Sequence, residues 1–151
     1  MKVLATFLVM FAATAFAGND DMVPLNRVLN GMPEPSYQYA RCAAFYLANV
    51  EWAGQALSEA VFETSKTSMS DLLIVATLVR SQKADEKIDH LAATVNLDAR
   101  QIADFYLKNY RQSYALRGTA WEANALWESD AETCRKIAEV AHAYVNQTGQ
   151  K

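Results

Sequence analysis

Basic residues are too few and too scattered in this chain to form a nucleic-acid-binding surface. The 151 residues include 14 lysines and arginines against 17 aspartates and glutamates, which gives a formal net charge of −3. Nucleic acid binding relies on clustered Lys and Arg side chains, and the sequence contains no such cluster. We therefore exclude nucleic acid as a partner.

Long apolar runs are scarce beyond the N-terminus. The stretch at residues 72–79 is apolar over only eight residues, whereas a membrane-spanning helix needs about 20. The N-terminus has a single lysine, then an apolar run, and closes with Ala15-Phe16-Ala17. This order is typical of a secretory signal peptide. We expect cleavage of residues 1–17 and no membrane span in the mature protein, and the alternative is an uncleaved membrane anchor.

Cysteine is limited to Cys42 and Cys134, which lie 92 residues apart. Two cysteines in an exported protein favour one disulfide, and a bridge closing so large a loop stabilises by about 4 to 5 kcal/mol in the chain-entropy model. The alternative is a reactive thiol, which needs a histidine or another cationic neighbour. His142 is the one histidine near either cysteine in sequence, so we predict a structural disulfide.

Proline is absent after Pro35. The three prolines all fall within residues 18–35, which we predict to be an irregular arm. Residues 22–32 of this arm are apolar enough to lie along the body of the protein. From residue 36 to residue 148 apolar residues recur at helical spacing. The sequence therefore predicts an all-α, single-domain bundle of four to five helices with one disulfide.

Start and stop signals predict where these helices lie. The first follows Ser36, and its apolar stripe includes Cys42 and extends to Val61. A second begins at Ser68, is buried on every side over residues 72–79, and continues through the polar stretch that follows, with or without a kink. The remaining helices run from Asp98 to Gly118, from Thr119, and from Ser129, and the last of these carries Cys134 on its apolar stripe.

Two aromatic residues lie on the first helix opposite its apolar stripe. Phe45 and Trp52 are either covered by another helix or by the arm, or they form an exposed patch. Because aromatic residues are enriched at interface hot spots, we treat this pair as a candidate partner-binding surface.

Tyrosines recur at every fourth position of the predicted third helix, at Tyr106, Tyr110 and Tyr114. Their rings either pack at the edge of the bundle with their hydroxyls reaching water, or line a groove for a peptide, a glycan or a small apolar ligand. Arg111 and Arg117 would supply charge beside such a groove.

Catalytic and metal-binding motifs are weak. Glu139 and His142 match one half of the di-metal pattern of helical bundles, which needs two such motifs and two further glutamates. His142 falls at the edge of its apolar stripe and His90 opposite the apolar face of its segment, so we expect both at the surface. We predict no metal and no cofactor, and an enzyme using His142 or His90 as its base is the least favoured alternative.

The function that these features favour is non-enzymatic. We expect an exported binding or accessory protein of the cell envelope, located in the periplasm or, as the alternative, secreted. Its partner would be another envelope protein, a peptide or a glycan. The second hypothesis is a carrier of a small apolar ligand, with an internal cavity near residues 72–79.

Overall fold

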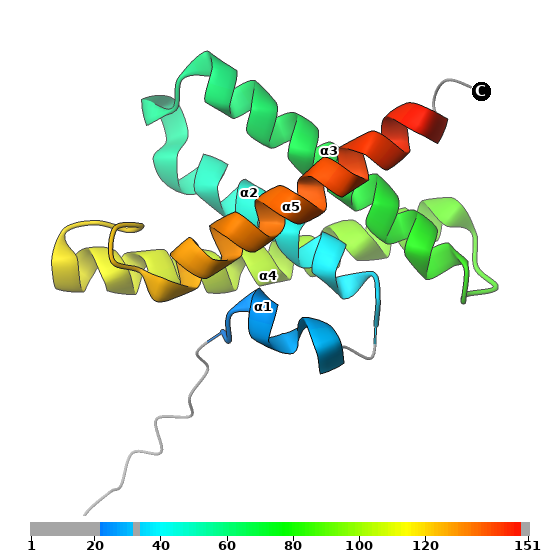
Figure 1. Ribbon diagram of the computed structural model, residues 1–151, viewed down its shortest axis with the longest axis horizontal. Helices are drawn as coiled ribbons and strands as arrows, with labels where there is room; N and C mark the ends of the chain where they lie inside the picture. Colours follow the sequence, from blue (N-terminus) through cyan, green and yellow to red (C-terminus); the bar gives the residue numbers. More distant parts are fainter. Residues whose placement is uncertain (1–21, 32–33, 149–151) are drawn as a thin grey trace, which may run out of the picture.

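The computed structural model describes residues 22–31 and 34–148, and in this part of the chain the regular elements are all helical. The elements are α1 (Leu25–Val28), the 3-10 helix η1 (Leu29–Gly31), α2 (Tyr37–Ala53), the 3-10 helix η2 (Gly54–Ala56), α3 (Glu59–Ser81), α4 (Ile88–Arg117) and α5 (Ala125–Thr148). Figure 1 shows α5 running across α2 and α3, with α1 beside that crossing. The predicted all-α bundle is confirmed, and the predicted signal peptide lies outside the described residues.

Helix α2 is the centre of the bundle and contacts α3, α4 and α5. Its buried positions are mostly alanines, and Ala43, Ala44 and Ala48 are each 0% exposed. Such short side chains let neighbouring helices approach closely, and the larger Phe45 fills the space beside them at 3% exposed. The interior is therefore packed around a thin, alanine-rich helix.

The predicted disulfide is confirmed. Cys42 on α2 and Cys134 on α5 are bonded, with 5.1 Å between their Cα atoms, and both residues are fully buried. The bridge joins the two helices at their crossing, as the apolar stripes of both helices indicated.

The first helix is shorter than its apolar stripe predicted. Helix α2 ends at Ala53 because Gly54 has a positive φ of 52°, a conformation that glycine adopts at little cost. Helix α3 then starts at Glu59, where the Ser58 hydroxyl accepts a hydrogen bond from the Val61 N–H. The predictions of one stripe reaching Val61 and of a helix start at Ser68 are therefore wrong. Apolar spacing continues on both sides of this turn, which hid it.

The polar stretch after α3 is a turn, not a continuing helix. Helix α3 ends at Ser81 and α4 begins at Ile88, so the predicted start at Asp98 is also wrong. Asp98 lies inside α4, and its carboxylate accepts a hydrogen bond from Arg80 Nη1 at 2.8 Å. An acidic residue that resembled a helix cap therefore pairs instead with a neighbouring helix.

The connection between α4 and α5 agrees only in part with its signals. Gly118 ends α4 as predicted, with a φ of 76°. Thr119 caps a turn, because its hydroxyl accepts from two backbone N–H groups, but no helix starts there. Helix α5 starts at Ala125, after Asn124, whose side-chain oxygen accepts from the Trp127 N–H. Ser129 therefore lies inside α5, and the predicted start at that residue is wrong.

Two apolar segments differ from expectation. In the described part of the arm, residues 22–31, Leu25 is fully buried against the body, as predicted, but residues 25–31 are helical rather than irregular. Residues 72–79 are not buried on every side, because Ile74 is 43% exposed. Among the described helices, none is long and apolar enough to cross a membrane.

Candidate functional site

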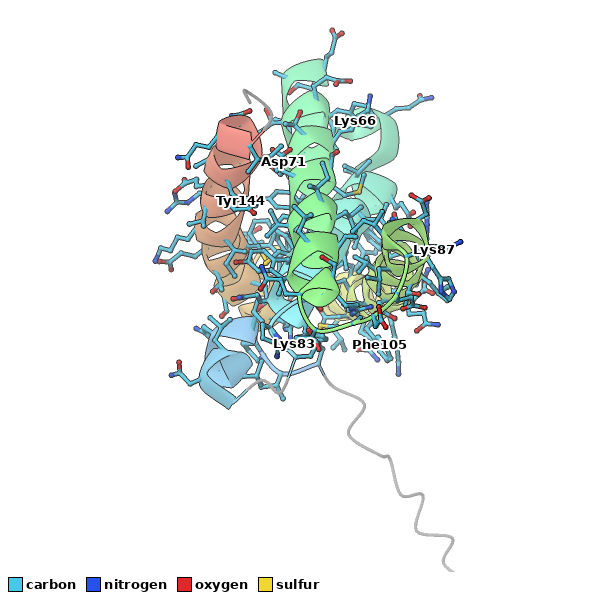
Figure 2. All side chains as sticks on the ribbon, turned by 90° about the vertical axis from the view of Figure 1, so that its right-hand side faces the viewer. Lys66, Asp71, Lys83, Lys87, Phe105 and Tyr144 are labelled. Carbon is cyan, nitrogen blue, oxygen red and sulfur yellow. A yellow bond between two sulfur atoms is a disulfide. The ribbon has the colours of Figure 1, made fainter. Side chains whose placement is uncertain are left out.

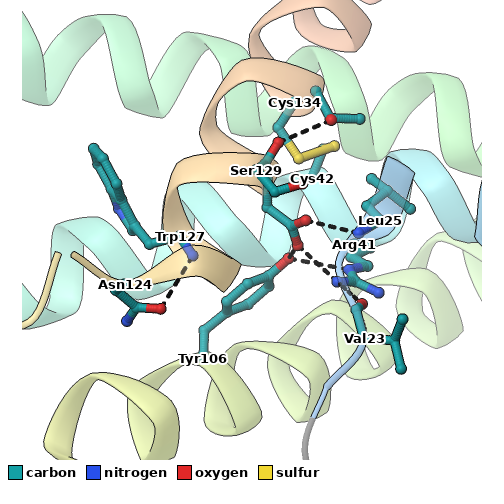
Figure 3. A network of polar contacts seen from close by, with 11 residues as sticks. Val23, Leu25, Arg41, Cys42, Tyr106, Asn124, Trp127, Ser129 and Cys134 are labelled. Carbon is teal, nitrogen blue, oxygen red and sulfur yellow. Dashed lines mark hydrogen bonds and ion pairs between the residues drawn. A yellow bond between two sulfur atoms is a disulfide. The ribbon is translucent and has the colours of Figure 1, made fainter. Parts of the chain in front are cut away.

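A buried polar cluster lies at the crossing of α2, α4 and α5 (Figure 3). Arg41 donates from Nη2 to Asp130 Oδ2 at 2.6 Å and from Nε to the Tyr106 hydroxyl at 3.1 Å. The Tyr106 hydroxyl in turn donates to Asp130 Oδ2. All three residues are at most 2% exposed, so each charge or hydroxyl has its partner inside the protein. We call these residues the Arg41 cluster.

The arm completes the Arg41 cluster through its backbone. The Val23 carbonyl accepts from Arg41 Nη2 at 2.6 Å, and the Leu25 N–H donates to Asp130 Oδ1 at 2.7 Å. Buried charges are tolerated only when they are paired and hydrogen-bonded. The arm therefore supplies two of the hydrogen bonds that compensate for the burial of this ion pair.

Electrostatics hold the cluster in one protonation state. Burial raises the pKa of the Tyr106 hydroxyl well above its ordinary value, so the hydroxyl keeps its proton. Burial acts to lower the pKa of Arg41, but Tyr106 and Asp130 outweigh it and raise that pKa. Both groups are therefore permanent donors, and the arrangement is suited to holding a structure rather than to exchanging protons.

A second polar contact lies on the same side of α2. Asn49 Oδ1 accepts from the Tyr110 hydroxyl and from Trp127 Nε1, both at 3.0 Å. Burial raises the pKa of Tyr110, so its hydroxyl also remains a donor. Neither this contact nor the Arg41 cluster was predicted. An available signal was Asp130, a charged residue placed four positions before Cys134 on the apolar stripe of α5.

The tyrosines do not line a common groove. Tyr106 and Tyr110 are fully buried, whereas Tyr114 is 56% exposed. Arg111 and Arg117 are exposed, and Arg117 donates to Ser113 of its own helix. The predicted groove therefore separates into two core residues and three surface residues. The helix presents successive tyrosines at slightly rotated angles, and its end projects beyond the core.

The predicted aromatic patch is not exposed as a pair. Phe45 is buried, and its ring packs edge-on against Tyr106 with centroids 5.6 Å apart. Trp52 is half-buried and packs edge-on against Tyr110 and Tyr114. Of the two alternatives, coverage by other helices therefore holds for Phe45, because α4 and α5 cover that side of α2, and the exposed patch does not.

The two histidines have partners on the surface. His142 Nδ1 lies 2.6 Å from Asp71 Oδ2, and the Asn146 amide nitrogen lies 3.0 Å from His142 Nε2. His90 pairs with Glu86 and is 71% exposed. Within residues 22–31 and 34–148, His, Cys, Asp and Glu form no group of three or more able to hold a metal ion.

An apolar groove separates the C-terminal halves of α3 and α5. Figure 2 shows the two helices side by side, with Asp71 and Tyr144 labelled on this side of the molecule. The groove contains a hollow of about 140 Å³. Val140 and Tyr144 at its edge are 63% and 44% exposed. Its lining residues are Tyr39, Val75, Leu78, Val79, Gln82, Val140, Ala141 and Tyr144.

This α3–α5 groove is close to the predicted position of a carrier cavity but differs from it in kind. Val75, Leu78 and Val79 belong to the apolar segment where that cavity was expected. Pockets for small ligands usually have about 300 Å³ or more. The hollow here is smaller, and its lining includes the exposed residues Gln82, Val140 and Tyr144, so it resembles a binding site for one side chain.

The assignment of a function to this protein rests on the residues described above. We compared the chain with protein-family models, with curated proteins and with solved structures, and none of them matches it.

Proposed function

We propose that this protein is an exported, non-enzymatic binding or accessory protein of the cell envelope. It binds a partner polypeptide by seating one apolar side chain in the α3–α5 groove. The observation that carries the proposal is the apolar hollow between Val75 and Val79 on α3 and Val140 and Tyr144 on α5, the last two being exposed at its edge.

The disulfide supports the proposed location. Disulfides persist in oxidising compartments and are rare in the cytosol, and Cys42 is bonded to Cys134. The signal-peptide pattern at residues 1–17 agrees with export. We favour the periplasm, and secretion beyond the cell is the alternative.

The chemistry of the polar groups supports binding over catalysis. His142 is held by neighbours of its own protein, Asp71 at Nδ1 and Asn146 at Nε2. Tyr106 and Asp130 are fully buried and bonded to each other. The buried carboxylate and hydroxyl of the Arg41 cluster are therefore sealed from substrate.

The lining of the groove favours a polypeptide over a glycan. Sugars need several hydrogen-bonding groups, whereas the side chains here are mainly aliphatic, with Gln82 and two tyrosines, Tyr39 and Tyr144, as the polar contributors. An aliphatic or aromatic side chain buries its apolar surface at about 25 cal/mol per Å². A hollow of this size suits a single anchor residue on a partner.

The test is affinity capture from the native envelope with a matched pair of variants. Val140→Asp combined with Tyr144→Ser places a charge at the groove, and Leu116→Asp places the same charge at a site on α4 that is 81% exposed. We expect the groove variant to lose a captured protein at least about tenfold while Leu116→Asp retains it. Both variants should keep the wild-type melting temperature, because the altered side chains are surface residues.

Two results would contradict the proposal. One is capture of the same protein by the groove variant at the wild-type level. The other is an equal loss with Leu116→Asp, which would assign the effect to surface charge rather than to the groove.

A further inference from the structure

We propose that the Arg41 cluster is a recognition site for a polypeptide segment of the form Xaa-Pro-Leu followed by a helical turn. In this chain the docked arm, residues 22–31, occupies the site as a ligand in cis. A partner polypeptide carrying a segment of the same chemistry takes its place when the arm is released. This inference uses residues distinct from the α3–α5 groove and does not depend on the function proposed for that groove.

The site recognises backbone atoms on the two sides of a proline. Arg41 Nη2 donates to the Val23 carbonyl at 2.6 Å, and Asp130 Oδ1 accepts from the Leu25 N–H at 2.7 Å. Pro24 lies between these two groups and has no N–H of its own, so a proline there leaves no donor unsatisfied. The pair of contacts therefore fits an extended Xaa-Pro-Xaa backbone (Figure 3).

Buried apolar side chains of the arm add sequence selectivity to this backbone recognition. Leu25 is fully buried, and Val28 and Leu29 are partly buried against the main core. These positions follow the i, i+3, i+4 spacing by which amphipathic helices dock into grooves. Asn26 and Arg27, on the other side of the turn, are exposed. The arm thus contacts the body as a bound peptide does, with buried anchors on one side and polar residues on the other.

The receptor side of the site also has contacts of its own that do not involve the arm. Arg41, Tyr106 and Asp130 bond one another through Asp130 Oδ2, which leaves Asp130 Oδ1 for the arm N–H. The disulfide fixes the neighbours of this group, because Cys42 follows Arg41 and Cys134 lies one helical turn after Asp130. Release of the arm would therefore leave the donor Arg41 Nη2 and the acceptor Asp130 Oδ1 oriented but without their arm partners. This favours rebinding of a similar segment.

The experiment uses the full chain with the arm displaced by Leu25→Asp, which puts a further charge into the apolar core where Leu25 is buried. The probe is a synthetic peptide of residues 22–31. We expect this peptide to bind the variant and to raise its melting temperature by about 5 °C at saturation. The wild-type chain, whose own arm fills the site, should bind the peptide at least about tenfold more weakly.

Modified peptides test the individual contacts. Methylation of the Leu25 nitrogen removes the donor to Asp130, and we expect affinity to fall about tenfold. A peptide methylated at the Val23 nitrogen is the matched control, because it keeps both the Val23 carbonyl and the Leu25 N–H. A peptide carrying Leu25→Asp should not bind detectably.

The proposal is overturned if the wild-type peptide fails to bind the displaced-arm chain. It is also overturned if the two methylated peptides bind equally, or if the wild-type chain binds as tightly as the variant. Should Leu25→Asp not fold, a protease site inserted after the exposed Gly31 allows the folded full chain to be cut. Labelled peptide must then exchange into the site, and failure to exchange at a large excess refutes the proposal.

Discussion

The two halves of α2 each contribute to an arginine–carboxylate pair with another helix. In the N-terminal half, Arg41 reaches Asp130 of α5 at 2.6 Å, with side chains 2% and 0% exposed. In the C-terminal half, Glu51 reaches Arg100 of α4 at 2.9 Å, with side chains 38% and 68% exposed. The chemistry and the contact distance are similar, and burial is the main difference.

Burial changes what each pair contributes. In the exposed pair, water and salt screen the charges, and such pairs contribute between zero and about 1 kcal/mol. In the buried pair each partner has lost its hydration, so removal of one leaves an uncompensated charge in the interior. The comparison teaches that the position of an ion pair relative to solvent decides whether it is needed for folding.

Among the changes that test this comparison, we expect the largest loss of stability from removal of the disulfide beside Arg41. Replacement of both Cys42 and Cys134 by alanine frees the first and last long helices, and we expect a loss of about 4 to 5 kcal/mol in the free energy of unfolding. Urea denaturation of the oxidised wild type and the double variant measures it. An unchanged free energy of unfolding would show that the buried half of α2 does not depend on the bridge.

The next largest effect should come from the buried carboxylate. Asp130→Asn keeps the size of the side chain but removes its charge, and we expect a loss of about 3 to 5 kcal/mol because Arg41 stays charged and buried. Urea denaturation of the variant at pH 7 gives the number.

Glu51→Gln is the matched control for the exposed pair. It should change stability by less than about 1 kcal/mol. Equal losses in Asp130→Asn and Glu51→Gln would mean that burial does not separate the two pairs.

The buried tyrosines should cause a smaller loss of stability, which appears at alkaline pH. Burial raises the pKa of Tyr106 and of Tyr110 above the ordinary value near 10. Above that pH the unfolded chain loses these two protons while the folded chain keeps them, so stability is complete below pH 10 and falls above it. At pH 11 the loss is about 1.4 kcal/mol for each residue, or about 3 kcal/mol together, and burial of Tyr46 acts in the same direction.

Urea denaturation between pH 8 and pH 11 measures this dependence, with free thiols assayed to confirm that the disulfide survives. The variant Tyr110→Phe should remove about half of the dependence attributed to the two residues. Tyr114→Phe is the control, because Tyr114 is 56% exposed. If Tyr114→Phe alters the dependence as much as Tyr110→Phe, burial is not its cause.

Local patterns predicted some helix ends and missed others for identifiable reasons. Gly118 was recognisable because a glycine after a helical run is the usual stop signal. The end at Gly54 was missed because apolar residues keep helical spacing across the turn. Asp98 imitated a helix start, although its carboxylate serves Arg80 of another helix. A local pattern cannot distinguish a cap from a tertiary partner.

The candidate sites were harder to predict than the fold. Phe45 was assigned to the far side of its helix, but an interior helix such as α2 is covered on several sides, and Phe45 packs against Tyr106 and Trp127. Arg41 carries a charge and so resembles a surface residue. The α3–α5 groove is formed by two helices, and the sequence does not indicate that these two helices are in contact.

The sequence by itself determined the helical class and the cysteine pair, because side-chain periodicity and a lone pair of cysteines are local or compositional properties. Only the tertiary structure decided which polar groups lie inside. A charge enters the interior only where partners meet it, and for Asp130 those partners are Leu25, Arg41 and Tyr106, which come from three other elements. Their meeting depends on how the helices cross, and no single segment specifies that crossing.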